Sequence, residues 1–121
     1  MPFAAKYDDT FLVAIEPAAL ANDAVAERVD HSGVAGNVVA QIHARIKSAK
    51  LIIADLSESR PNVLHEVGFA EALKKPVIQI TSTQANSLPF NVRNNQTLTY
   101  SIGQSMRLRN RLEAEIKKNL P

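Results

Sequence analysis

Two short runs of apolar residues constrain the fold of this chain more than any other feature. Leu51–Ala54 reads Leu-Ile-Ile-Ala and is followed by Asp55, and Val77–Ile80 reads Val-Ile-Gln-Ile. Runs of this kind, without polar alternation, are typical of parallel strands that are covered on both faces. Pro76 precedes the second run and is expected to end the helix before it. The sequence therefore predicts two buried parallel strands with a helix between them.

Helical patterns separate the predicted strands along the chain. In these patterns apolar residues recur every three or four positions, as on the buried face of an amphipathic helix. Pro17 lies inside the first pattern and is expected to kink or divide that helix. The predicted helices are Asp9–Asn22, Asn37–Ser48, Arg60–Lys74 and one after Gly103 in which Leu108, Leu112 and Ile116 share a face; the other predicted strands are Val25–Val29 and Thr97–Tyr100, and Ser82–Gln96 is a polar loop.

This alternation predicts a single α/β domain over residues 1–121, with a parallel sheet and helices on both faces. Such folds normally open with a strand, whereas this chain passes from Met1–Phe3 almost directly to a helix. The first strand is therefore expected to be short or missing. Ligands of open parallel sheets bind beyond the carboxyl ends of the strands, which directs attention to Asp30 and Asp55.

Composition narrows the classes of function. The chain has no cysteine, which excludes a disulfide scaffold and a cysteine nucleophile, and its three histidines are not spaced like metal ligands, so no metal is expected. The net charge is only +2, and the late basic residues mix with acidic ones, which favours a solvated helix face over a nucleic-acid surface. No apolar run approaches the ~20 residues of a membrane span and no secretory signal is recognisable, so we expect a cytoplasmic protein without a membrane partner.

The densest group of chemically capable residues follows the first apolar run. Asp55 stands at the end of a strand, and Asn62 and Glu66 lie four residues apart on one face of the next helix. Gly68 costs about 1 kcal/mol relative to alanine in a helix, so close approach of a ligand or of another backbone is expected there. A fixed carboxylate in such a place can stabilise the oxocarbenium-like transition state of cleavage at an anomeric carbon.

The stretch from Ile46 to Ile80 resembles the nucleoside 2-deoxyribosyltransferase and TIR-like superfamily. The family pattern is Ala-Asp-Leu, Pro-Asn-Val, Glu-x-Gly-x-Ala and Lys-Pro-Val-Ile, in that order. The resemblance implies a flavodoxin-like fold of the kind found in bacterial TIR-like nucleotide-binding domains. The matching residues are Ala54–Leu56, Pro61–Val63, Glu66–Ala70 and Lys75–Ile78, with weaker similarity at Met1–Phe3, Tyr7–Asp9, Arg28–Asp30 and Leu88–Arg93.

The resemblance also implies an activity and a site. Glu66 corresponds to the catalytic carboxylate of the family, and Asp55 and Asn62 to residues that contact the ribose or the base. The implied activity is that of an N-glycosidase or N-deoxyribosyl transferase on a nucleoside, nucleotide or NAD-like substrate, with NAD bound as a substrate and no cofactor required. The further residues expected to contact the substrate are Asp30, Gly68, Phe3 and Tyr7.

Several alternatives stay open. Asp55 is equally well explained as a cap of the next turn, and Asn62 as a residue that bonds locally near a helix start. Phe3 and Tyr7 either line a base pocket or cover the edge of the sheet. The domain is either an enzyme or a non-catalytic module that senses a nucleotide or assembles through its surfaces. Because a missing first strand leaves backbone groups of the central strand unpaired, we expect a homo-oligomer, most simply a dimer.

Overall fold

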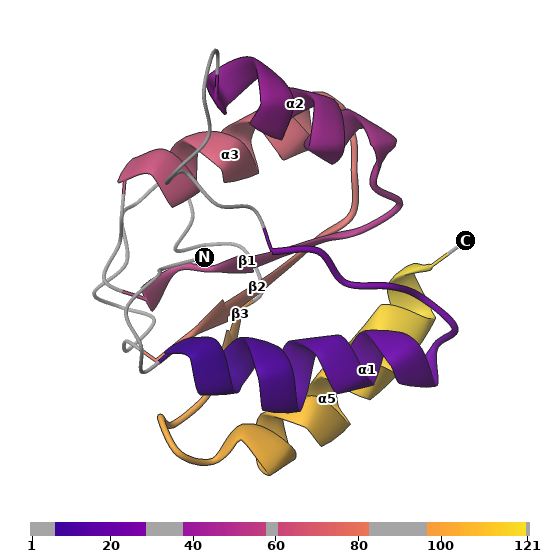
Figure 1. Ribbon diagram of the computed structural model, residues 1–121, viewed down its shortest axis with the longest axis vertical. Coiled ribbons are helices and arrows are strands. Elements are labelled where there is room, and N and C mark those ends of the chain that lie inside the picture. The colour runs from indigo at the N-terminus through magenta and orange to yellow at the C-terminus, as the bar shows by residue number, and fades with distance from the viewer. Residues whose placement is uncertain (1–6, 29–37, 58–60, 83–96, 121) are drawn as a thin grey trace.

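A computed structural model describes residues 7–28, 38–57, 61–82 and 97–120 of the chain. Its centre is a three-stranded parallel sheet in the order β1-β2-β3, and Figure 1 shows this sheet between two layers of helices. The structure therefore confirms the α/β class and the parallel sheet. The strands are β1 (Ile52–Asp55), β2 (Val77–Thr81) and β3 (Thr97–Thr99).

Helices α2 and α3 cover one face of the sheet, and α1 and α5 cover the other (Figure 1). No helix among the described residues is both long enough and apolar enough to span a membrane. The bounds of the helices agree with the predicted segments to within a few residues. They are η2 (Thr10–Ile15, a π-helix), α1 (Glu16–Ala21), α2 (Val38–Ser48), α3 (Pro61–Ala72) and α5 (Ser105–Asn119).

The first helical segment changes from a π-helix to an α-helix next to Pro17 and continues without a break, whereas a kink or a division of the helix was expected there. The π-helix η2 ends at Ile15, and α1 begins at Glu16, so that Pro17 lies in the first turn of α1. Proline has no amide hydrogen to donate, and the first turn is where a helix tolerates it. One apolar cluster joins this segment to α5 and the sheet, and it includes the predicted face of α5. The buried residues of the cluster are Ala14, Ile15, Ala18, Ile78, Ile80, Leu108, Leu112 and Ile116.

The predicted strand at Val25–Val29 is wrong for residues 25–28, and Val29 lies outside the described residues. Residues 24–28, which we call the connection, leave α1 and pass beside β1 without forming a ladder with any strand that the structure describes. A strand is defined by hydrogen bonds to a neighbour, and here a cavity separates the connection from β1. The predicted absence of a first strand concerns residues 1–6, which also lie outside the described part of the chain.

Candidate functional site

Asp55 ends β1 in a fully buried position, where its carboxylate accepts three hydrogen bonds. The backbone N–H and the hydroxyl of Ser57 donate to Oδ1 over 3.0 and 2.6 Å, and the hydroxyl of Tyr100 donates to Oδ2 over 2.6 Å. The Ser57 hydroxyl accepts in turn from the backbone N–H and the hydroxyl of Ser82, both at 2.9 Å. A buried carboxylate with this set of donors needs no ligand to satisfy it.

This Asp55 network ties together the carboxyl ends of all three described strands. Asp55 ends β1, Ser82 follows β2 and Tyr100 follows β3. Burial, and then the negative charge of Asp55, raise the pKa of Tyr100 well above its usual value, so the phenol stays protonated and keeps donating at neutral pH. The geometry favours the interpretation of Asp55 as the cap of its own turn over direct contact with a ligand.

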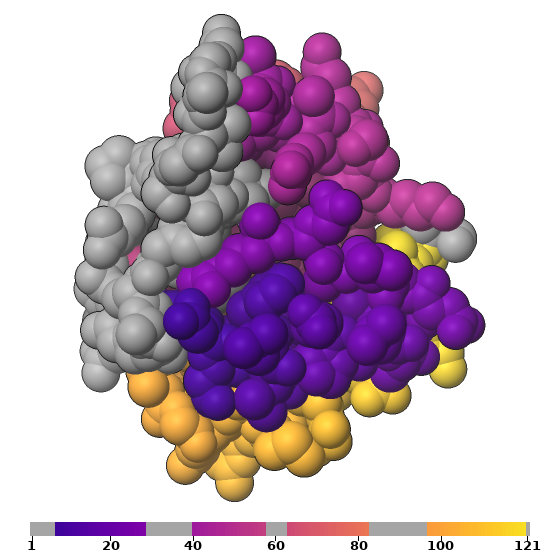
Figure 2. Space-filling view, in the orientation of Figure 1, coloured from indigo at the N-terminus to yellow at the C-terminus, as the bar shows by residue number. Residues whose placement is uncertain are grey.

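A cavity of about 650 Å³ lies along the edge of β1 that faces away from β2. Consecutive residues 51–54 line it on one side, and consecutive residues 24–28 of the connection line it on the other. Because successive side chains of a strand point to opposite faces, consecutive lining residues place the cavity in the plane of the sheet. Figure 2 shows the connection crossing this face of the molecule between the first helical segment and α2. The volume lies within the roughly 300–1,000 Å³ of small-molecule sites.

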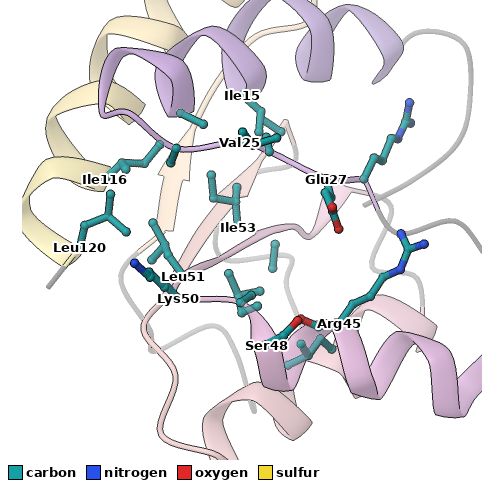
Figure 3. A pocket seen from close by; sticks show the side chains of 18 of the residues that line it. Ile15, Val25, Glu27, Arg45, Ser48, Lys50, Leu51, Ile53, Ile116 and Leu120 are labelled. Atoms are coloured by element: carbon teal, nitrogen blue, oxygen red, sulfur yellow. The ribbon is translucent and has the colours of Figure 1, made fainter.

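Glu66 of α3 is partly exposed and lines this cavity. Glu27 and Arg28 of the connection and Arg45 of α2 line it as well, so that charges of both signs face one space. Figure 3 shows Glu27 and Arg45 on one side of the cavity. The apolar side chains of Ile116 and Leu120 lie on the opposite side in the same view. The side with Glu27 and Arg45, which we call the charged side, thus lies opposite a mainly apolar side that also carries Lys50 (Figure 3).

The structure brings only part of the predicted site together. Tyr7 is 1% exposed and belongs to the buried core, and neither Tyr7 nor Asp55 lines the cavity that Glu66 lines. Gly68 is exposed and does not line the cavity. A Cβ added to it would meet no described atom within 4 Å, so the expected close approach of another backbone is not found among the described residues, and a ligand contact there stays a prediction. Asn62 lies on α3 with its side chain outside the described set, and Phe3 and Asp30 lie outside the described residues.

Sequence reasoning did not find the partners of Asp55 or the basic residues of the cavity. Ser82 and Tyr100 each directly follow a strand, so the rule that parallel strands gather their carboxyl ends would have placed them beside Asp55. Arg45 carries no such signal, because it lies in the middle of an ordinary amphipathic helix. Its place at the cavity depends on how α2 packs beside the open edge of β1.

Among the described residues, no group of three or more histidine, cysteine or acidic side chains is arranged to hold a metal ion. No protein-family model, curated protein or solved structure matches the chain. The functional interpretation therefore rests on the residues of this chain and on their arrangement.

Proposed function

We propose that this domain is an N-glycosidase or N-glycosyl (deoxyribosyl) transferase that acts on a nucleoside, nucleotide or NAD-like substrate, within a flavodoxin-like fold of the TIR and deoxyribosyltransferase type. The observation that carries the proposal is a partly buried carboxylate, that of Glu66, in the wall of a cavity of about 650 Å³. The similarity of the residues around Glu66 to Glu-x-Gly-x-Ala supports the same chemistry.

The proposed reaction breaks the bond between the anomeric carbon of the sugar and a nitrogen of the base. The base leaves with the bonding electron pair, and positive charge develops on the anomeric carbon and the ring oxygen. The carboxylate of Glu66 either stabilises that charge or attacks the carbon to form a glycosyl ester. Water or an acceptor base then forms the new bond to the anomeric carbon and gives up a proton. A departed purine or pyrimidine takes up a proton, whereas nicotinamide departs from an NAD-like substrate as a neutral molecule and the proton is released to solvent.

The basic residues of the cavity favour a phosphorylated substrate. Arg28 and Arg45 line the same space as Glu66, and guanidinium groups bind phosphate oxygens through paired hydrogen bonds. Arg28 is held in place by Asp8, whose Oδ1 lies 2.7 Å from its Nη1. Arg45 is exposed and reaches the charged side of the cavity (Figure 3). A nucleoside 5′-phosphate therefore suits this cavity better than an uncharged nucleoside.

The burial of Asp55 favours a second candidate function, a module that binds a nucleotide without turnover. Both carboxylate oxygens of Asp55 already accept hydrogen bonds from Ser57 and Tyr100, and the side chain has no exposed surface. It is therefore in no position to orient ribose hydroxyls. In this alternative Glu66 recognises the sugar of a bound nucleotide and breaks no bond.

One experiment separates the two candidates. The protein is incubated with a panel of nucleosides, nucleoside 5′-phosphates and NAD, free base is measured by chromatography, and binding is measured by calorimetry. Release of base supports the enzyme, whereas binding without release supports the non-catalytic module. The same measurements are made on Glu66→Gln. Its matched control is Glu71→Gln, because Glu71 is an exposed glutamate of the same helix that does not line the cavity. A protein that neither binds nor cleaves any member of the panel contradicts both candidates.

A further inference from the structure

A second cavity lies at the opposite edge of the sheet from the cavity that Glu66 lines. It has a volume of about 220 Å³ and lies between the end of β3 and the first two turns of α5. The strand order β1-β2-β3 puts β3 at one edge of the described sheet, whereas the first cavity borders β1. We call this second cavity the basic hollow; its lining consists of residues 99–101, Gln104, Arg107, Leu108 and Arg111.

Both charged residues in the lining of the basic hollow are arginines. Arg107 and Arg111 are exposed, and they lie four residues apart on one face of α5. Like charges at this spacing destabilise a helix. Among the described residues, Arg107 has no hydrogen-bond or ion-pair partner, and Arg111 donates only to the backbone carbonyl of Thr99. No acidic side chain of the described residues is therefore paired with either cation.

Three acidic residues of this region bond to other groups. Tyr100 lines the basic hollow, but its hydroxyl donates to Asp55, whose carboxylate is fully buried. Asp9 accepts a hydrogen bond from the side chain of the first residue of α5. Glu115, one turn beyond Arg111, lies 3.4 Å from the Nζ of Lys118. None of the three lines the basic hollow, so its described lining carries positive charge only.

We propose that the basic hollow binds the phosphate group of inorganic phosphate or of a small phosphate monoester, held by the guanidinium groups of Arg107 and Arg111. A guanidinium presents its N–H groups as a planar fork, and two forks match the several oxygens of a phosphate. The side chains of Ser101 and Gln104 add neutral donors. An anion bound to both arginines also offsets their mutual repulsion.

The volume and the lining limit the size of the ligand. At about 220 Å³ the basic hollow is smaller than the roughly 300–1,000 Å³ of sites for drug-sized molecules, so it takes a phosphate group with few further atoms. Leu108 is the only buried apolar side chain among the described lining residues, which leaves little apolar surface for a base. The proposal goes beyond the proposed function and does not rest on it, because the two cavities share no lining residue.

A phosphate titration of the full chain tests the basic hollow directly. Inorganic phosphate and methyl phosphate are added in separate arms, the backbone amide shifts are followed by NMR, and sodium chloride of equal ionic strength is the reference. We expect the Gln104 and Arg107 amides to shift saturably with phosphate in the millimolar range and not with chloride. Binding of both probes supports a site for phosphate monoesters, and binding of inorganic phosphate alone supports a site for the free ion.

Matched variants separate a specific contact from general attraction. Arg107→Gln is expected to weaken phosphate binding at least about tenfold, because it removes one of the two guanidinium groups. Arg109→Gln removes the same charge from the same helix, but Arg109 does not line the basic hollow. Its binding should stay within about twofold of the original protein, since salt screens charges that make no contact. Arg107 is exposed, so its replacement is expected to leave the fold intact.

Each remaining outcome has one meaning. Equal weakening by Arg107→Gln and Arg109→Gln, or equal amide shifts with chloride, shows general attraction and overturns the proposal. Absence of any saturable shift overturns it too, as do shifts that are confined to the cavity of Glu66 and are lost in Arg45→Gln. Failure of nucleotides to bind or react, with phosphate binding at the basic hollow intact, contradicts the proposed function and leaves this inference standing.

Discussion

The two carboxylates on either side of the turn after β1 have opposite surroundings. Asp55 is fully buried and accepts three hydrogen bonds, in a network that closes the carboxyl ends of three strands. Glu66 is partly exposed in the wall of a cavity along the open edge of β1. The comparison shows that β1 is tightly packed where it pairs with β2 and borders a cavity along its other edge, with which no described strand pairs. We therefore expect Asp55 to contribute to stability, and the proposed function depends on Glu66.

The largest expected effect is that of Asp55→Ala on stability. The variant leaves the hydroxyl of Tyr100 and the backbone N–H of Ser57 without their acceptor, and each unsatisfied buried group costs about 1–3 kcal/mol. We expect the free energy of unfolding to fall by about 3 kcal/mol in urea titrations. Glu71→Gln is the surface control, with an expected change within about 0.5 kcal/mol. A loss below about 1 kcal/mol for Asp55→Ala would remove the structural role of Asp55.

Tyr100→Phe removes a single donor from the same carboxylate and is expected to cost less. A hydrogen bond to a charged group contributes about 1.5–3 kcal/mol, and Tyr100 is only partly buried, so we expect a loss near the lower end of that range. The measurement is again urea unfolding at neutral pH. A variant as stable as the original would show that the bond of 2.6 Å contributes nothing.

The raised pKa of Tyr100 also predicts a pH dependence. In the unfolded chain its phenol has the ordinary pKa of 10.0, whereas burial and Asp55 raise the pKa in the folded protein. The unfolded state therefore loses its proton first, and the contribution of Tyr100 to stability is complete below about pH 10 and declines above it. Urea unfolding on both sides of this pH should show a steeper decline for the original protein than for Tyr100→Phe. If the stability of the two proteins declined equally with pH, the proposed contribution of the raised Tyr100 pKa would be contradicted.

Residues in buried strands and helix faces were predictable because their patterns are local. The apolar run that ends at Asp55 and the recurring Leu108, Leu112 and Ile116 each reflect one element and its own burial. The strand expected at Val25–Val29 failed for residues 25–28 because strand formation depends on a neighbour that the residues themselves do not encode. Likewise, the sequence near Asp55 does not reveal that its carboxylate accepts a hydrogen bond from Tyr100, because Tyr100 follows a different strand.

The smallest expected effect concerns the choice of substrate. Arg45→Gln removes one exposed cation from the charged side of the cavity, so we expect binding of a nucleoside 5′-phosphate to weaken about fivefold. Binding of the matching nucleoside, which has no phosphate, should stay unchanged. Lys47→Gln on the same helix is the control, because Lys47 is exposed and does not line the cavity. Equal losses for nucleoside and nucleotide would contradict a phosphate contact.

The rate of base release by Glu66→Gln tests the central claim most directly. Loss of a transition-state carboxylate is expected to lower the rate at least about 100-fold. The free energy of unfolding should change by less than about 1 kcal/mol, because Glu66 is partly exposed. Glu71→Gln should release base at the original rate. Equal rates of base release for Glu66→Gln and the original protein would contradict the assignment of function to Glu66.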